Sequence, residues 1–93
     1  MTIEQVPGKD CGNVFLYTLS TCGWCKKTKE LLHELGVQYR YVDVNLLGMD
    51  EQEEALEALK KLNPEGSFPT IIVNDSEVIC GYNPDQLRAA LKG

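Results

Sequence analysis

The apolar and polar positions of this chain fall into two patterns, and each pattern indicates a different kind of element. Residues 13–18 contain a continuous apolar run at 14–17, which is typical of a strand that is buried on both faces. Over residues 23–35 the apolar side chains recur every three or four positions, which predicts an amphipathic helix that Gly36 ends.

The middle of the chain repeats this order. Residues 38–44 nearly alternate Tyr or Val with polar side chains and predict a second strand, and residues 50–62 predict a second helix. Acidic residues gather at the start of that helix, while Lys60 and Lys61 lie at its end, as the helix dipole favours. Because a helix connects the two strands, we expect them to be parallel.

The last third of the chain predicts a hairpin and a helix. Strands are expected at 70–74 and 77–80, and the connection between them is short enough to force an antiparallel pair. Asn83 is expected to cap a third helix, with Pro84 at its first position and Gln86 three residues after the cap. This order predicts an α/β fold with a mixed four-stranded sheet (β-α-β-α-β-β-α) and three helices covering both faces.

Composition limits the classes of function. The 93 residues fit a single domain, 1–93, in which residues 1–9 are expected to form a loose arm. A net charge of -5 does not suit a broad phosphate-binding surface, so we expect no nucleic-acid partner. The N-terminus has no signal-like pattern and no apolar run reaches the length of a membrane span, so we expect a cytoplasmic monomer without membrane contacts.

The motif Cys22-Gly23-Trp24-Cys25 stands where the first strand gives way to the first helix. A thiol at a helix N-terminus faces unpaired amides and the positive end of the dipole, and such thiols have pKa values of roughly 3.5 to 7.5 instead of about 8.5. We therefore expect Cys22 to be the nucleophile. Cys25 lies beside it on the helix surface, placed to resolve the mixed disulfide that Cys22 forms with a substrate.

The same spacing also serves zinc, but a structural zinc site needs four ligands, usually from two such pairs. Cys11 and Cys80 are isolated in the sequence, and His33 falls on the exposed side of the first helix. A close thiol pair in the cytoplasm then favours redox chemistry, and we expect no metal ligands. Cys11 is expected to be an exposed thiol and Cys80 to be buried.

Phe68-Pro69-Thr70 precedes the third strand, and a proline there can be a plain boundary. Beside a CxxC pair we favour a cis Phe68-Pro69 bond, which would present the Phe68 backbone as a short edge for an extended substrate. Trp24 is expected on the surface as an apolar docking platform. Tyr82 either does the same from the opposite rim or fills space above the last helix.

Three motifs in this order, the CxxC, Phe68-Pro69-Thr70 and the stretch 80–85, resemble the glutaredoxin branch of the thioredoxin superfamily. The resemblance spans about residues 14–91. It implies a thioredoxin-like fold and a dithiol oxidoreductase that reduces protein disulfides. It also implies a set of substrate-binding residues: Gly23, Trp24, Phe68, Pro69, Thr70, Gly81, Tyr82 and Asp85.

Glutaredoxins that use glutathione usually carry a lysine three residues before the first cysteine and a Gly-Gly pair at the last helix. Leu19 and Gly81-Tyr82 occupy these places, although Asp85 matches the acidic position that meets the amino end of glutathione. The missing cation argues against glutathione as reductant, and no cofactor is expected beyond the redox-active cysteine pair.

The stretch 81–85 is closer to NrdH-type redoxins, which are reduced by thioredoxin-type reductases and feed ribonucleotide reductase. The resemblance thus implies a carrier of electrons from a disulfide reductase to disulfide-containing proteins. The alternative is an iron-sulfur or metal-binding module that uses Cys22 and an external thiol across a dimer. A resolving Cys25 competes with that use by closing a disulfide.

Overall fold

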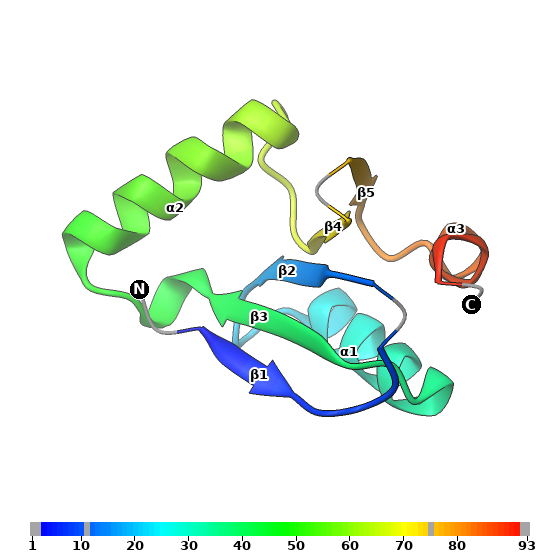
Figure 1. The fold of residues 1–93 in the computed structure, drawn as a ribbon. Coiled ribbons are helices and arrows are strands. Elements are labelled where there is room, and N and C mark those ends of the chain that lie inside the picture. The colour runs from blue at the N-terminus through cyan, green and yellow to red at the C-terminus, as the bar shows by residue number, and fades with distance from the viewer. Residues whose placement is uncertain (1–2, 11, 75, 92–93) are drawn as a thin grey trace.

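A computed structural model describes residues 3–10, 12–74 and 76–91, and in them a five-stranded sheet lies between helices on its two faces (Figure 1). The elements in chain order are β1 (Glu4–Val6), β2 (Val14–Thr18), α1 (Gly23–Leu35), β3 (Tyr39–Asp43), the 3-10 turn η1 (Val44–Leu46), α2 (Met49–Leu62), β4 (Thr70–Val73), β5 (Glu77–Cys80) and α3 (Pro84–Ala90). They match the predicted elements to within a residue or two at each end, apart from β1 and η1.

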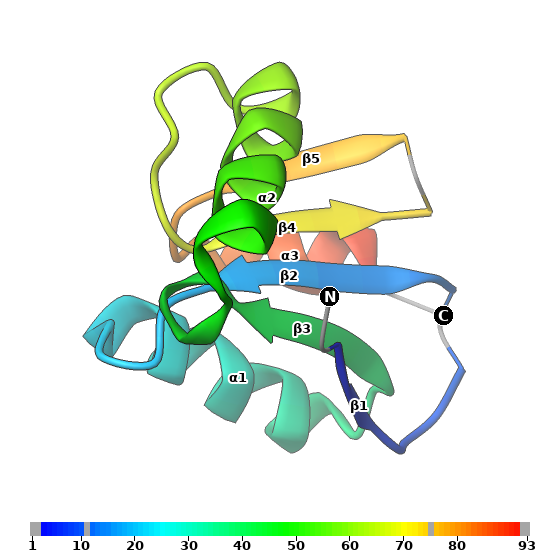
Figure 2. The same cartoon turned by 90° about the vertical axis from the view of Figure 1, so that its left-hand side faces the viewer.

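The sheet has the order β1-β3-β2-β4-β5. β2 and β3 are parallel, as their helical crossover predicts, while β4 is antiparallel to both β2 and β5. Thr70 is paired with Tyr17 on one side and with Cys80 on the other. The C-terminal ends of β2 and β5 therefore meet the start of β4 at one end of the sheet (Figure 2).

The structure corrects two expectations about the N-terminal segment. Within its described part, residues 1–9 are not a loose arm, and the sheet has five strands rather than four. β1 pairs antiparallel with β3, and the Lys9 amide then donates to the Gly36 carbonyl at 2.7 Å. The pairing satisfies backbone groups on the outer side of β3 that would otherwise lack partners.

The two faces of the sheet carry separate cores. Under α1 and α3 the core is mostly aliphatic and consists of Val14, Leu16, Leu31, Leu32, Val37, Tyr39, Ile71, Val73, Ile79, Leu87 and Leu91. Under α2 it is smaller and consists of Tyr17, Val42, Val44, Ala55 and Leu59, with half-buried neighbours that include Phe15 and Phe68. Leu16 and Tyr17 face opposite sides, which confirms the prediction that the first predicted strand is buried on both faces.

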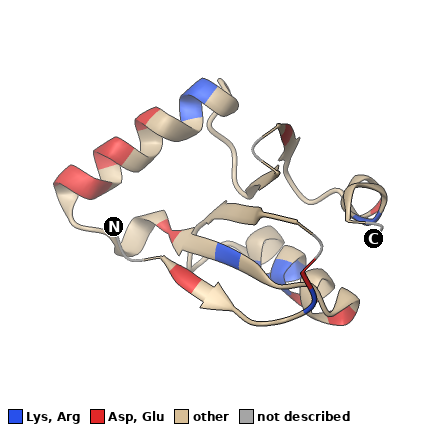
Figure 3. Cartoon of the chain, in the orientation of Figure 1, with Lys and Arg blue, Asp and Glu red and all other residues tan. Residues whose placement is uncertain are grey.

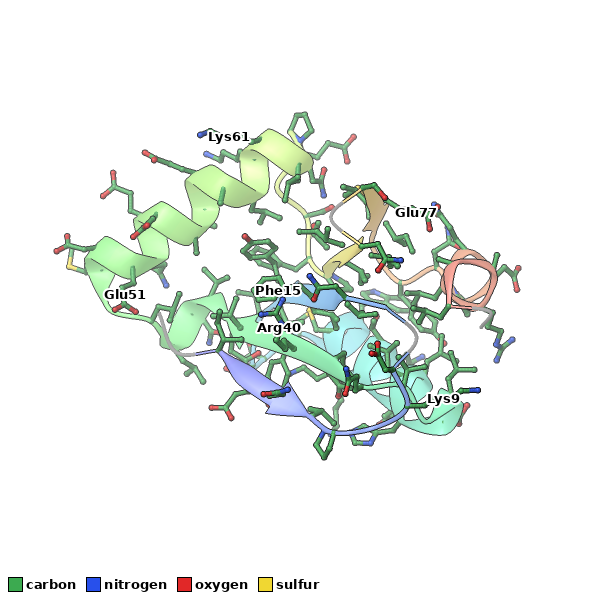
Figure 4. All side chains as sticks on the ribbon, viewed as in Figure 1. Lys9, Phe15, Arg40, Glu51, Lys61 and Glu77 are labelled. Carbon is green, nitrogen blue, oxygen red and sulfur yellow. The ribbon has the colours of Figure 1, made fainter. Side chains whose placement is uncertain are left out.

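Charge is distributed unevenly over these layers. α2 carries acidic side chains along its length and lysines at its last turn (Figure 3). On the same side of the sheet the guanidinium of Arg40 lies 5.6 Å from the centre of the Phe15 ring, which extends the cover of the sheet beyond α2 (Figure 4). Charged side chains thus line the α2 side of the sheet, whereas the two cysteines of the CxxC motif lie at the start of α1 on the opposite side.

Candidate functional site

Cys22 is the N-cap residue of α1, as the sequence predicts. Its backbone is extended, with φ -88° and ψ 119°, and its sulfur accepts a hydrogen bond from the Cys25 amide at 3.2 Å. The Cys25 amide and the positive end of the helix dipole both stabilise negative charge on this sulfur. Because Cys22 is only half-buried, a substrate sulfur can also reach it.

The loop before Cys22 is fixed by hydrogen bonds to its neighbours. The Cys22 amide donates to the Leu19 carbonyl at 3.1 Å. The Ser20 amide donates to the Asn45 side chain at 2.9 Å, and the Asn45 amide group donates back to the Ser20 hydroxyl at 2.7 Å. This reciprocal pair joins the loop to η1, so the sulfur is positioned by η1 as well as by α1.

Cys25 is fully buried, with no exposed surface. Burial raises the pKa of Cys25 to about 12, and a hydrogen bond with the Cys22 sulfur acts in the same direction. The Leu19 backbone and the Lys29 charge lower that pKa but do not outweigh the burial. Both cysteines are free thiols, and they differ in access, as a division into attacking and resolving thiols requires.

Trp24 is on the surface, as expected, with 57% of its area exposed. Its ring stacks on Tyr82 with centroids 5.6 Å apart and an interplanar angle of 25°. The ammonium of Lys27 lies 4.9 Å from the centre of the Trp24 ring. Tyr82 thus lies directly against Trp24, and it also packs against the core beneath α3.

The Phe68-Pro69 peptide bond is cis, which confirms the prediction. Pro69 and Thr70 are buried and Phe68 is half-buried. The Thr70 hydroxyl donates to the Ser67 carbonyl at 2.8 Å and accepts from the buried Asn63 side chain at 3.1 Å. These bonds hold the loop at the end of the sheet where β2 leads into the CxxC motif (Figure 2).

Gly81 joins this loop to the start of α3. Its amide donates to the Pro69 carbonyl at 2.7 Å, and its φ of 76° is one that glycine adopts without strain. Asn83 caps α3 by accepting from the Gln86 amide at 3.3 Å, and its own side chain donates to Gln86 at 3.0 Å. The predicted cap is confirmed, and it leaves Asp85 exposed in the first turn of α3.

Sequence reasoning missed a polar cluster beside the buried thiol. The Lys29 ammonium lies 3.3 Å from an Asp43 carboxylate oxygen and 3.9 Å from the centre of the Tyr41 ring. The same carboxylate oxygen accepts from the Thr18 hydroxyl at 2.7 Å. The signal that the sequence offered was the spacing, since Lys29 follows Cys25 by four residues. It was missed because a lysine on a helix is ordinarily taken as a solvated side chain.

The glutaredoxin family model matches residues 14–78 of the chain. The chain belongs to the glutaredoxin family. The glutaredoxin of Methanosarcina mazei Go1 is 47% identical, with a TM-score of 0.89 over 98% of this chain and 88% of that one. The methanoredoxin of Methanosarcina acetivorans is 48% identical, with a TM-score of 0.88 over 92% and 90%. NrdH-redoxin from Escherichia coli is 25% identical, with a TM-score of 0.69 over 83% and 92%.

Family membership gives the site its general chemistry. The protein is a glutaredoxin-like redoxin with a thioredoxin-like fold, and its function is thiol-disulfide exchange. The attacking role of Cys22 and the resolving role of Cys25 stay predictions. The same holds for the substrate contacts of the residues around them. Those residues come from three segments, 22–25, 68–70 and 81–85.

The remaining candidates lie elsewhere or outside the described residues. Cys80 was expected to be buried, and this is wrong, because Ile79 takes the core position of β5 and Cys80 is exposed. Cys11 lies outside the described residues. His33 is exposed as predicted, and Tyr39 and Tyr41 pack on one strand face with centroids 6.1 Å apart.

Neither a metal-binding group of side chains nor a membrane-spanning helix is found in the described ranges 3–10, 12–74 and 76–91. No three His, Cys, Asp or Glu side chains in these ranges are grouped so that they could hold a metal ion. Within the same ranges, every helix is too short or too polar to span a bilayer.

Proposed function

We propose that this glutaredoxin reduces disulfides of target proteins through a Cys22-Cys25 dithiol cycle. The observation that carries the proposal is the contrast between the two sulfurs. Cys22 is reachable at the helix start and accepts an amide hydrogen bond, while Cys25 is buried one turn further on. A substrate therefore meets one thiol first, and the second is held in reserve for the resolving step.

The cycle has two exchange steps. The Cys22 thiolate attacks a substrate disulfide, forming a mixed disulfide and releasing the first substrate sulfur as a thiolate that takes up a proton. Cys25 then gives up its proton and attacks the Cys22 sulfur, which releases the second substrate thiol. The substrate gains two electrons, and the Cys22-Cys25 pair loses two.

Protein substrates are favoured by the surroundings of Cys22. The exposed stack of Trp24 and Tyr82 offers a flat apolar surface, which suits a docked polypeptide. Phe68-Pro69 adds the backbone edge that an extended chain can pair with. Glutathione carries no large apolar group that would use this stack.

We further propose that a thioredoxin-type disulfide reductase in the cytoplasm returns the electrons, and that ribonucleotide reductase is among the targets. Support comes from Leu19 in place of the usual lysine and from the likeness to NrdH-redoxin, a glutaredoxin-like protein with a thioredoxin-like activity profile. We propose that the chain works as a monomer and holds no cofactor.

The test compares electron donors and cysteine variants in one assay, with insulin disulfides as the substrate. We expect turnover with NADPH and thioredoxin reductase and little with glutathione and its reductase; a ferredoxin-linked reductase is the third donor. Cys22→Ser should abolish turnover, whereas Cys25→Ser should accumulate mixed disulfides. Turnover that survives in Cys25→Ser would replace the dithiol cycle with a monothiol one.

A thiol count separates this function from the iron-sulfur alternative. Mild oxidation should remove two free thiols, and the freshly purified protein should have no visible absorption. A coloured protein in which mild oxidation forms no Cys22-Cys25 disulfide would identify Cys22 as a cluster ligand and would overturn the proposal.

A further inference from the structure

The resolving step poses an electrostatic problem at Cys25. To attack the mixed disulfide, this thiol must lose its proton inside the core, where a negative charge is poorly solvated. Burial raises the pKa of Cys25 to about 12. A positive charge near Cys25 would therefore favour the thiolate at the moment of attack and speed the release of the mixed disulfide.

Lys29 is placed to do this. It follows Cys25 by four residues within α1, so the two side chains are neighbours on one face of the helix. Side chains on a helix lean toward its N-terminus, which brings the Lys29 stem back over the turn that holds Cys25. Burial is the largest influence on the pKa of Cys25 and raises it, whereas the Lys29 charge acts in the opposite direction as the smallest influence, after the Cys22 sulfur and the Leu19 backbone.

The ammonium of Lys29 is held rather than freely solvated. Its side chain is 22% exposed and that of Asp43 is 16% exposed, in contrast to the exposed Lys26 and Lys27. Asp43 binds it at 3.3 Å, and Asp43 is fixed in turn by the Thr18 hydroxyl at 2.7 Å. An ion pair that is ordered at both partners keeps its charge at a defined place in a region that water only partly screens.

The other charged and titratable groups around Lys29 are few among the described residues. Tyr41 and Asp43 face it from β3, and Cys22 and Cys25 share its helix. Burial, with the Asp43 and Glu4 carboxylates, raises the pKa of Tyr41, so this ring is a neutral neighbour at physiological pH. Lys29 is thus the cation of this cluster.

We propose that Lys29, held by Asp43, is a positioning residue that stabilises the Cys25 thiolate during the resolving attack. This inference rests on the dithiol cycle proposed above. In the assisted step a bond forms between the Cys25 and Cys22 sulfurs and the Cys22-substrate bond breaks. The proton that Cys25 loses to solvent is balanced by the one that the departing substrate thiolate takes up, and Lys29 keeps its own protons throughout.

The size of the effect follows from two opposing trends. If removal of the charge lowers the thiolate fraction of Cys25 about tenfold, the remaining thiolate becomes about threefold more nucleophilic, because nucleophilicity rises with basicity with a coefficient of about 0.4 to 0.5. The resolving rate of Lys29→Met should therefore fall about threefold at neutral pH. Its pH profile should move to higher pH.

The experiment follows single-turnover reaction with Ellman's reagent, 5,5'-dithiobis(2-nitrobenzoic acid), in a chain with Cys11→Ser and Cys80→Ser so that only the reactive pair reports. The first equivalent of released thiolate marks attack by Cys22, and the second marks resolution by Cys25. We expect Lys29→Met to slow the second phase about threefold and leave the first unchanged. Lys29→Arg should restore the second phase, because it restores the charge.

Lys61→Met is the matched control. It removes the same charge from the exposed last turn of α2, which covers the opposite face of the sheet from α1, and should behave like the parent (Figure 4). A second phase that is unchanged in Lys29→Met, or equally slow in Lys29→Arg, would overturn the inference. If the Met variant does not fold, Lys29→Gln with the same readout takes its place. A parent chain that releases only one equivalent would instead refute the dithiol cycle itself, and the inference with it.

Discussion

The buried thiol of Cys25 should be almost inert toward alkylation in the reduced protein, and the structure sets the size of this effect. With a pKa of about 12, this thiol is ionised at about one part in 10⁴ at pH 8, because the ionised fraction falls about tenfold for each pH unit below the pKa. An unperturbed cysteine with a pKa of about 8.5 is ionised at roughly one part in four at that pH. Because nucleophilicity rises with basicity with a coefficient of about 0.4 to 0.5, each Cys25 thiolate is in turn about 25- to 60-fold more nucleophilic. Cys25 should therefore react about 40- to 100-fold more slowly than an exposed thiol, before its lack of access is counted.

Iodoacetamide labelling followed by peptide mass spectrometry measures this directly. Cys80 serves as an internal reference, because it is exposed and lies outside the reactive pair. Cys22 should be labelled first, while Cys25 should stay unlabelled long after Cys80 is complete. The rate at Cys25 should rise about tenfold per pH unit between pH 7 and 10, since its pKa lies above that range. If Cys25 is labelled as fast as Cys80, or if its labelling rate does not change with pH, the raised pKa of Cys25 is refuted.

Further expectations concern stability, the aromatic rim and the potential. Burial raises the pKa values of both Cys25 and Tyr39 to about 12, so from about pH 9 upward the unfolded chain loses these protons before the folded one does. The free energy of unfolding should then fall with rising pH, by up to about 1.4 kcal/mol per pH unit for each group. Urea unfolding from pH 8 to 11 measures this fall, and a free energy that does not change with pH would contradict it. Tyr82→Ala should cost about 0.5 to 1.5 kcal/mol through loss of the stack with Trp24, whereas Tyr82→Phe should cost less; urea melts of both variants decide this, and equal losses would contradict the role of the ring. The reduction potential should lie at roughly -270 to -200 mV on equilibration with glutathione or dithiothreitol buffers, and a value near about -120 mV would mark an oxidant instead.

Much of the fold can be predicted from the sequence because its signals are local. The apolar run of β2, the cap that Asn83 provides and the short connection between β4 and β5 each depend on a few adjacent residues. The helix-start position of Cys22 follows from the same reasoning, since β2 ends at Thr18, one residue after its apolar run, and a helical period begins at Gly23. Local signals thus give the element order and the place of the nucleophile.

The features that could not be predicted depend on contacts between distant segments. β1 has only three residues, and it becomes a strand because β3 offers a free edge more than thirty positions later. The exposure of Cys80 depends on which face of the edge strand β5 is covered by the rest of the protein, and the sequence of β5 alone does not indicate that face. The pairing of Lys29 with Asp43 requires α1 to lie against the end of β3, which only the packed structure shows.

The reactive cysteine is positioned mainly by backbone groups and by polar side chains away from the rim. The Cys22 amide donates a hydrogen bond to the Leu19 carbonyl. The segments 68–70 and 81–85 are joined by the hydrogen bond from the Gly81 amide to the Pro69 carbonyl. Neither bond uses the side chains of Trp24 or Tyr82. Substitutions at those two rings are therefore expected to leave the sulfur in place, because the hydrogen bonds that hold it do not involve them. If the two rings dock the substrate, as proposed, we expect their substitution to change substrate choice while the exchange chemistry of the cysteine pair is kept.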